Sequence, residues 1–345
     1  MMTIEVDLHS DTQTRPSEGM RDAMVSADVG DEQRGEDPSA NRLCELAAGL
    51  TGKEAAVFMP SGTMCNQAAM LVHCKPGDEI IADKTSHIIN SESGGAAALA
   101  GAQIRPVDGE RGVFTAEQAE EAINIAKRNF PRTSMIEVEQ TSNAGGGSVW
   151  PLASILEVAD VAKRHGLALH MDGARLLNAV VASNVTAADF GEPFDSLWID
   201  LSKGLGCPIG AVLCGSSDFI EQAWSWKQRL GGAMRQSGVI AAAGVYALEN
   251  NVERLAEDHA SARRFADGIA YVSGIEVWPV ETNLVFFNLK NTGLTAQDFH
   301  ERLLERGVRI GIKSEFEMRA VTHLDVSMDQ VDRAVDAVAE VVAGA

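Results

Sequence analysis

The sequence predicts an α/β protein in two parts: a large domain built on a mostly parallel sheet, and a smaller α+β domain at the C-terminal end. In residues 1–250, short apolar strands alternate with helices, which indicates crossover connections and a sheet covered on both faces. Beyond that point the strands and helices look segregated, as in an α+β domain. We therefore predict two domains, residues 1–250, including the N-terminal segment, and residues 251–345.

The composition is that of an acidic protein with a large core. With 345 residues and 45% hydrophobic content, the chain can bury one large core and a smaller one. No window approaches about eighteen uncharged apolar residues, and residues 1–9 lack the basic and apolar regions of a signal peptide. We expect a cytoplasmic protein without a membrane partner.

The charge and the cysteines exclude several classes of function. A net charge of −20 repels nucleic acid, so an anionic ligand would need its own basic pocket. The five cysteines form no C-x-x-C pair, which argues against a disulfide framework or a structural zinc site. No metal site is expected.

The first elements follow from local signals. Residues 7–16 are rich in side-chain donors and lack a helical period, and Pro16 with Ser17 opens a helix. Residues 30–38 are either a solvated loop or a lid or interface loop. The elements expected here are helices 18–26 and 40–50, strand 55–59 and a helix ending near residue 73.

Apolar periodicity predicts the alternating units that follow. The expected strands are 79–82, 103–107, 134–139, 167–171, 196–199 and 209–214, and the expected helices are 91–99, 116–127, 152–165, 219–229 and 239–248. The terminal part is expected to contain helices 252–272, 296–306 and 328–343 and strands 276–279, 284–289 and 318–322.

A turn of small residues, Ser61-Gly62-Thr63, lies between a predicted strand and a predicted helix. This arrangement offers free backbone N–H groups to a phosphate. The turn lacks the lysine of a P-loop and the glycines of a dinucleotide fingerprint. The alternative is that these residues only cap the helix.

Two predicted strand ends carry polar side chains, and ligands gather at such ends in parallel sheets. His87 follows the first end, either as a buried core residue or as an aromatic contact to a ligand. Asp172 and Arg175 follow the second, either as an ion pair that holds the loop or as part of a site. In the latter case Asp172 would balance a ring-nitrogen cation, as a pyridoxal-phosphate site requires.

Lys203 lies in a glycine-rich turn between two predicted strands, and its one close charge is Asp200. A lysine is placed in this way when its amine must reach a carbonyl carbon and form a Schiff base. The alternative is a solvated loop lysine.

Taken together, these motifs resemble the fold-type-I pyridoxal-phosphate enzymes and, more closely, the low-specificity threonine aldolases of the β-eliminating lyase family. The resemblance runs nearly from end to end. The motifs that carry it are Ser10-Asp11-Thr12, Gly35-Glu36-Asp37-Pro38, Ser61-Gly62-Thr63, His87, Asp172-Gly173-Ala174-Arg175, Ser202-Lys203-Gly204-Leu205-Gly206, Met234-Arg235-Gln236-Ser237-Gly238 and Thr322-His323-Leu324-Asp325.

The resemblance implies a role for each matching residue. Lys203 would hold pyridoxal 5'-phosphate, Asp172 would keep its ring nitrogen protonated, and His87 would stack on the ring and is the candidate general base. The remaining cofactor contacts would come from Ser61, Gly62, Thr63, Arg175, Ser202 and, from a neighbouring subunit, Arg235. The substrate contacts would come from Ser10, Arg34, Ser142, Arg175 and Arg319.

The resemblance also implies the reaction and the assembly. A β-hydroxy-α-amino acid, such as L-threonine or L-allo-threonine, would be cleaved between Cα and Cβ to glycine and an aldehyde. The alternative is elimination from a β-substituted or acidic-side-chain amino acid, which gives a 2-oxo acid and ammonia. A catalytically silent scaffold and a nicotinamide-dependent oxidoreductase fit the residues less well. The subunits would form at least a dimer, and the resemblance implies a tetramer.

Two positions depart from the family pattern. Arg34 replaces a tyrosine, and we hypothesise that it favours substrates whose side chain ends in an acid or another polar group. Ser142 replaces a histidine that would meet the β-hydroxyl; a serine can hydrogen-bond there but is not a base near neutral pH.

Overall fold

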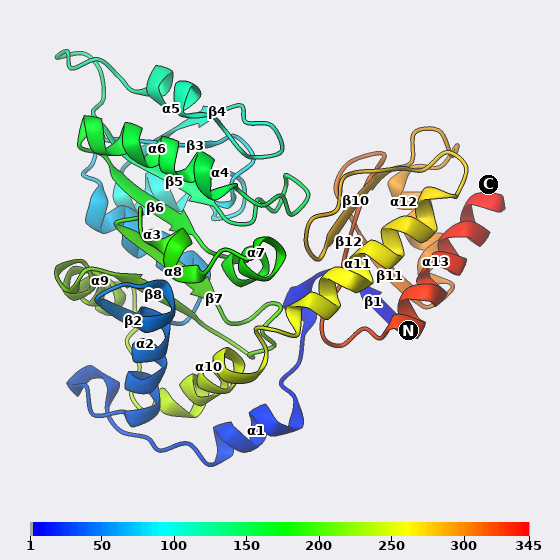
Figure 1. The fold of residues 1–345 in the computed structure, drawn as a ribbon, viewed down its shortest axis with the longest axis horizontal. Helices are drawn as coiled ribbons and strands as arrows, with labels where there is room; N and C mark the ends of the chain where they lie inside the picture. The colour runs from blue at the N-terminus through cyan, green and yellow to red at the C-terminus, as the bar shows by residue number, and fades with distance from the viewer. Residues whose placement is uncertain (1–2, 345) are drawn as a thin grey trace.

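The computed structural model describes residues 3–344, which form two lobes, each built on its own sheet (Figure 1). Within this range, no helix combines the length and the apolar character needed to cross a membrane. The two lobes are unequal, and the larger one contains most of the predicted strand-end motifs.

The larger lobe contains a sheet of seven strands among the described residues, in the order β2-β8-β7-β6-β5-β3-β4. Its strands are β2 (Ala55–Met59), β3 (Glu79–Asp83), β4 (Gln103–Val107), β5 (Thr133–Glu139), β6 (Ala168–Asp172), β7 (Ser196–Asp200) and β8 (Ala211–Gly215). Strand β8 runs antiparallel to both its neighbours, and the other pairings are parallel. The prediction of a mostly parallel sheet is therefore confirmed.

Helices cover this sheet and extend beneath it. They are α1 (Glu18–Val25), α2 (Pro38–Thr51), α3 (Gly62–His73), α4 (His87–Asn90), α5 (Ala116–Ala122), α6 (Leu152–His165), α7 (Leu176–Ser183), α8 (Ala187–Gly191), α9 (Ser217–Arg229) and α10 (Gly238–Asn250). Their ends follow the sequence signals: Asp37 caps α2 just before Pro38, and Gly52 ends that helix with φ at 67°.

The smaller lobe joins both ends of the chain. Its sheet has the order β1-β11-β12-β10-β9, with strands β1 (Val6–Leu8), β9 (Glu276–Val277), β10 (Leu284–Asn288), β11 (Val308–Ile312) and β12 (Glu317–Val321). Helices α11 (Leu255–Ala270), α12 (Ala296–Leu304) and α13 (Met328–Ala343) complete it. Because β1 pairs in parallel with β11, the first strand lies in this sheet, although the sequence division groups it with the large domain. The division into two domains remains a prediction.

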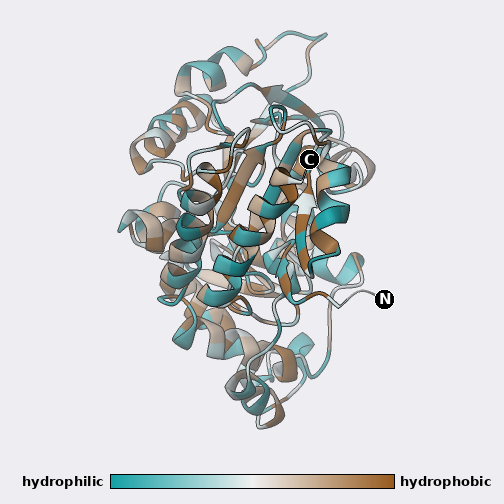
Figure 2. Ribbon diagram, turned by 90° about the vertical axis from the view of Figure 1, so that its right-hand side faces the viewer, coloured by the Kyte–Doolittle hydropathy of each residue, from teal (hydrophilic) through white to brown (hydrophobic). Residues whose placement is uncertain are grey.

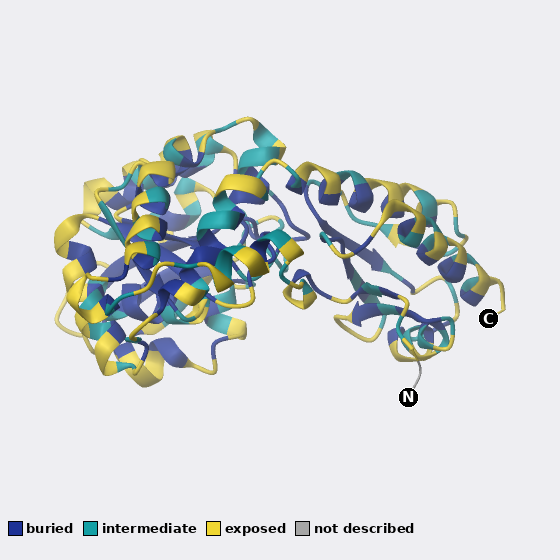
Figure 3. Cartoon of the chain, turned by 90° about the horizontal axis from the view of Figure 1, so that it is seen from below, coloured by how far each residue is buried: buried dark blue, intermediate teal, exposed yellow. Residues whose placement is uncertain are grey.

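Apolar side chains fill the interior of each lobe. One cluster surrounds residues such as Trp150 and Phe190 in the larger lobe, and another surrounds Phe265, Phe287 and Phe299 in the smaller one. Figure 3 shows the buried residues gathered in the strands and on the inward sides of the helices. Viewed from the smaller lobe, helices carry hydrophilic and hydrophobic stretches side by side (Figure 2), as expected of helices with one buried face.

Several elements differ from the sequence prediction. The expected helix 91–99 is wrong, because Ser93 and Gly94 take positive φ and leave one π-helical turn, Ala96–Ala100. Helix α5 stops at Ala122, earlier than expected. The short elements β1, β11, α7 and α8 were not predicted. Their three- to eight-residue lengths give little periodic signal.

The polar loop 30–38 is anchored to the protein by a buried ion pair. The Nζ atom of Lys227 lies 2.6 Å from Glu32 Oε1, and both side chains are almost completely inaccessible to solvent. Ser237 Oγ and the Met234 amide also donate to the Glu32 carboxylate, and the Lys227 ammonium lies 4.3 Å from the centre of the Trp224 ring. The loop is therefore anchored at Glu32, while residues 33–36 remain exposed.

Glu32→Ala should destabilise the protein by about 3–5 kcal/mol, because it leaves the Lys227 ammonium buried without its carboxylate. The free energy of unfolding, measured by urea denaturation, checks this. The control is Asp332→Ala, which breaks the exposed pair with Arg264 and should change stability little. Equal effects of the two variants would contradict the assignment of Glu32 as an anchor.

Candidate active site

The predicted strand-end groups lie at one edge of the seven-stranded sheet. Strands β2, β3, β5, β6 and β7 all run in the same direction, so the segments that follow them leave from the same edge. These segments carry Ser61 to Thr63 after β2, His87 after β3, Ser142 after β5, Asp172 to Arg175 after β6, and Lys203 after β7. This is the edge where ligands bind in parallel α/β sheets.

Lys203 is held by the turn that follows β7. Its Nζ atom lies 2.8 Å from Asp200 Oδ2, three residues earlier, and the side chain keeps 19% of its accessible surface. The ammonium is also 5.7 Å from the centre of the Trp198 ring. Ser202 donates both its amide and its hydroxyl to the other Asp200 oxygen. The lysine is therefore positioned by its own turn and is not a freely solvated surface residue.

Asp172 ends strand β6 and is buried. Its Oδ1 accepts the Ala174 amide at 3.0 Å, and its Oδ2 accepts Asn66 Nδ2 at 2.8 Å. Burial raises the pKa of Asp172, while the Lys203 ammonium and the Asn66 hydrogen bond oppose that rise. The carboxylate is thus shielded from water and held by fixed donors.

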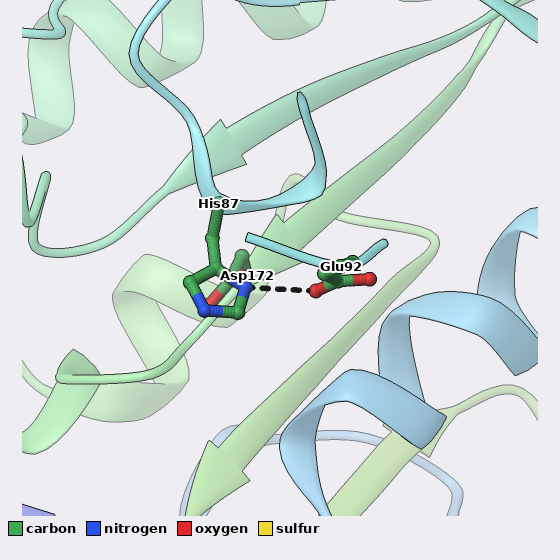
Figure 4. Close-up of side chains that lie close together, drawn as sticks. All are labelled: His87, Glu92 and Asp172. Atoms are coloured by element: carbon green, nitrogen blue, oxygen red, sulfur yellow. Dashed lines mark hydrogen bonds and ion pairs between the residues drawn. The ribbon is translucent and has the colours of Figure 1, made fainter. Parts of the chain in front are cut away.

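His87 lies beside Asp172 and forms a pair with Glu92 (Figure 4). The Nδ1 atom of His87 is 2.9 Å from Glu92 Oε1, and this hydrogen bond raises the pKa of His87 against the effect of burial. A ring nitrogen of His87 and one carboxylate oxygen each of Glu92 and Asp172 lie within 4.8 Å of one another. Because Asn66 Nδ2 also donates to Glu92 Oε1, the three side chains form one hydrogen-bonded cluster.

Arg175 is committed to a second buried pair. Its Nε and Nη2 atoms each lie 2.7 Å from an oxygen of Asp11, which belongs to the segment after β1. Burial opposes ionisation of Asp11, but the Arg175 guanidinium outweighs it and keeps the pKa of Asp11 well below its usual range. The Arg175 guanidinium therefore links the two lobes at the site, and its Nη1 atom takes no part in the pair with Asp11.

Arg319 on β12 is a second guanidinium near this pair. Its Nη1 donates to Asn143 Oδ1 at 2.7 Å, while its Nε is buried without a hydrogen-bond partner among residues 3–344. Burial, and then the Arg175 charge, lower the pKa of Arg319 to about 10. Burial, Arg319 and Arg175 likewise lower the pKa of Lys313 to about 8. An anion would be favoured here, because Arg319 has a buried donor without a partner among residues 3–344 and lies in the field of other cations.

The turn before α3 presents exposed polar groups. Ser61 caps the helix by accepting the Met64 amide, and both Ser61 and Thr63 are exposed. A Cβ on Gly62 would lie 2.2 Å from the Trp198 ring, so a glycine is needed for this close approach. The turn thus brings the N-terminus of a 12-residue helix against the strand that leads to Lys203.

Glu139 at the end of β5 joins two parts of the site. Its oxygens accept the His87 amide and the Asn143 amide, each at 2.8 Å. Burial, and then the Asp172 charge, raise the pKa of Glu139 to about 7, and the two amides only partly oppose this. Burial also raises the pKa of neighbouring Glu137 well above its usual range.

This raised pKa predicts a pH effect on stability. Between pH 4.5 and about 7, folded Glu139 holds its proton more tightly than the unfolded chain does, so its contribution to stability is lost as the pH rises through this window. Glu139→Gln should make the unfolding free energy fall less steeply there, by up to about 1.4 kcal/mol per pH unit. Urea denaturation at several pH values measures the slope, with exposed Glu157→Gln as the control. An unchanged slope in Glu139→Gln would contradict the prediction.

Three predicted residues form their ion pairs or hydrogen bonds with partners other than the groups described above. Arg34 is exposed, with its Nε 3.9 Å from Asp31 Oδ2, and Arg235 Nη1 lies 2.8 Å from the same carboxylate. Within the described chain, neither forms a hydrogen bond or ion pair with His87 or Lys203. Ser142 is buried and accepts the Gly145 amide, so its hydroxyl also shapes its own loop.

Ser10 is buried beside Asp11 and accepts both donors of Thr12, the amide at 3.2 Å and the hydroxyl at 2.8 Å. It therefore caps the turn that presents Asp11 to Arg175.

Sequence reasoning missed several residues of the site. Asn66, Glu92, Glu139 and Asn143 each contact a predicted residue through their side chains. The signal for Glu139 was its position at a strand end, whereas Asn66 lies within helix α3 and gave no such signal. Glu92 gave no such signal, because the stretch around it was predicted to be a helix.

Comparisons with known proteins give a consistent result. A family model described as beta-eliminating lyase matches residues 7–292. The chain is 42% identical to a low specificity L-threonine aldolase of Escherichia coli (strain K12) over 327 residues, 94% of this chain and 96% of that protein. It is 40% identical to low-specificity L-threonine aldolase 1 of Arabidopsis thaliana over 338 residues, 96% and 94% of the two chains. A solved structure of Leishmania major threonine aldolase matches with a TM-score of 0.84 at 21% identity, covering 98% of this chain and 99% of that one.

Proposed function

The chain belongs to the beta-eliminating lyase family, and on this premise we propose that it is a pyridoxal-phosphate-dependent aldolase. It cleaves β-hydroxy-α-amino acids of the L-threonine and L-allo-threonine type to glycine and an aldehyde. The observation that carries this function is the convergence of Lys203, Asp172 and His87 at one sheet edge, together with the buried Arg175 and the half-buried Arg319 near the same place. Its fold is that of the fold-type-I enzymes.

The residues at this edge fit the cofactor. Pyridoxal phosphate supplies an aldehyde that condenses with amines and a ring that accepts the electrons released when a bond to Cα breaks. Lys203 offers the amine, and the buried Asp172 carboxylate offers a partner for a protonated ring nitrogen. The turn Ser61-Gly62-Thr63 offers hydroxyls and a helix N-terminus to a phosphate, and Ser202 adds a hydroxyl beside Lys203.

His87 would accept the proton of the substrate's β-hydroxyl. With Nδ1 directed at the Glu92 carboxylate, 2.9 Å away, the Nε2 atom is left to take up a proton. Loss of the hydroxyl proton lets the Cα–Cβ bond break and the aldehyde leave. Glu92 stabilises the imidazolium that forms, because it faces the opposite ring nitrogen.

The substrate's carboxylate would bind between the two lobes. Arg319 has a buried Nε without a partner among the described residues, and Arg175 has its Nη1 outside the Asp11 pair. A carboxylate placed there would relieve the repulsion between the two guanidinium groups. Ser10 and Ser142 each precede a residue that contacts one of these arginines, Asp11 and Asn143 respectively. We propose both serines as further substrate contacts.

We propose a homo-oligomer in which Arg235 reaches the site of a neighbouring subunit, since in its own subunit it pairs with Asp31 on the exposed loop. The smallest assembly that allows this contact is a dimer, and we propose a tetramer. We also propose that the protein acts in the cytoplasm. The exposed Arg34 on the same loop would then face a neighbouring site and favour acidic or otherwise polar substrate side chains. An unchanged substrate ranking in Arg34→Tyr would contradict that selectivity.

Product analysis tests the function. Purified protein with pyridoxal phosphate should release glycine and acetaldehyde in equal amounts from L-threonine and from L-allo-threonine. The competing activity, β-elimination, would instead give a 2-oxo acid and ammonia. A panel with both Cβ epimers of several β-hydroxy amino acids identifies the preferred substrate, and absence of glycine from every member would overturn the proposal.

A further inference from the structure

Asn66 on α3 is the hub of a buried hydrogen-bond network behind the site. Its side chain is completely inaccessible to solvent. The Nδ2 group donates to Asp172 Oδ2 at 2.8 Å and to Glu92 Oε1 at 2.7 Å. The Oδ1 atom accepts Trp198 Nε1 at 2.7 Å and faces His170 Nε2 at 3.1 Å. All four hydrogen-bonding positions of the amide are therefore used.

The chemistry of the neighbours fixes which way this amide points. An indole N–H can only donate, so the atom facing Trp198 must be the Asn66 oxygen. The two atoms facing the other side are carboxylate oxygens of Asp172 and Glu92, which accept. A flipped amide would place two donors against each other on one side and two acceptors against each other on the other.

The same reasoning gives the direction of each hydrogen bond beyond Asn66. His170 Nε2 must carry a proton to donate to the Asn66 oxygen, and burial lowers the pKa of His170 to about 3, so its Nδ1 is an acceptor. Nδ1 lies 2.8 Å from Ser196 Oγ, which must donate to it. Ser196 Oγ can then accept from His73 Nε2, also 2.8 Å away. Each hydrogen bond in the series is thus donated in the same direction. The series begins at His73 on α3, passes through Ser196, His170 and Asn66, and ends at Asp172.

We propose that Asn66 is a positioning residue: its amide holds the Asp172 carboxylate as a charged acceptor in one orientation, and the donors Trp198 and His170 fix the direction of that amide. This rests on the proposed function, because the group that Asp172 would serve is the cofactor's ring nitrogen. Asn66 also bridges two carboxylates that would otherwise repel each other. The charged and titratable groups that interact electrostatically with Asp172 are Lys203, His87, Glu92, Glu137, Glu139 and Cys65.

The test uses two ligands that differ at one atom. Apo protein is titrated with pyridoxal phosphate and with its analogue in which a C–H unit replaces the ring nitrogen, and both dissociation constants are measured by absorbance. Asn66→Ala should weaken binding of pyridoxal phosphate about tenfold and change binding of the analogue less than about twofold. The visible absorbance of the loaded variant should also change with pH across a range where the wild type is constant.

Two further variants keep the test decisive. Asn66→Leu removes the amide and fills its space, so it guards against collapse of the site in the alanine variant. Ser134→Ala removes a buried hydroxyl whose hydrogen bond goes to Cys74, outside this network, and it should bind both ligands like the wild type. Equal weakening of both ligands in the Asn66 variants would show a merely structural role and overturn the proposal, as would no weakening at all. If wild-type protein fails to bind pyridoxal phosphate, the proposed function fails instead.

Discussion

Lys203→Ala should lower kcat for glycine release by about 10³-fold or more. The variant lacks the one amine that Asp200 and the Trp198 ring hold at the end of β7, and a covalent attachment cannot be replaced by a weaker contact. Lys203→Arg should be almost as inactive, because a guanidinium keeps the charge near Asp200 but does not provide a nucleophilic amine. Steady-state assays with L-threonine measure both variants.

A second lysine provides the control for this experiment. Lys84 also follows a strand end, after β3, but its ammonium pairs with exposed Asp108, so Lys84→Ala should keep wild-type activity. Mass spectrometry after borohydride treatment with pyridoxal phosphate should find the cofactor mass on Lys203 in the wild type and in Lys84→Ala. Full activity in Lys203→Ala, or attachment at another lysine, would remove the basis for the mechanism.

Local sequence signals predicted the groups that lie within one turn of a strand. Lys203 and Asp200 are three residues apart, so their ion pair could be anticipated from the turn itself. Alternating strands and helices predicted that His87, Asp172 and Lys203 would leave the sheet at the same edge. These features depend on hydrophobic periodicity and strand direction, both of which are written in short stretches of sequence.

Contacts between distant segments could not be predicted in this way. The bidentate pair of Arg175 with Asp11 joins residues 164 positions apart, and β1 joins β11 across some 300 residues. Neither pairing leaves a periodic signal, because each depends on how the two lobes meet. The geometry at Glu92 was hidden for a different reason: positive φ at Ser93 and Gly94 interrupts a stretch whose composition favours a helix.

Buried polar residues were the other class that sequence reasoning undervalued. Asn66 lies in a helix of small and apolar residues, where an amide looks like an ordinary interior position. Only the structure shows Trp198, His170 and two carboxylates converging on it. A buried polar group needs its partners, so the fact that these partners surround a proposed catalytic carboxylate makes Asn66 part of the site.

Arg319→Leu should raise KM for L-threonine by roughly 10- to 150-fold, the range of one charged hydrogen-bond pair. Its guanidinium is held by Asn143 at 2.7 Å and keeps a buried Nε without a partner among the described residues, as expected of a donor that waits for a substrate carboxylate. Because the carboxylate is bound in the ground state and in the transition state alike, kcat should change much less than KM. Arg319→Lys should give a KM between those of the wild type and Arg319→Leu, since lysine keeps the positive charge but cannot form the two parallel hydrogen bonds of a guanidinium.

Arg309→Leu is the matched control on the neighbouring strand β11. Its guanidinium is already paired with Asp7 and donates to Gln13, so its loss should lower stability by weakening the contact of β1 with β11 and leave KM near the wild-type value. The split between the two variants separates a binding role from a structural one, because both remove a guanidinium from the same sheet. If Arg319→Leu lost stability but kept its KM, the substrate's carboxylate would have to bind elsewhere, and Nη1 of Arg175 would be the next candidate donor.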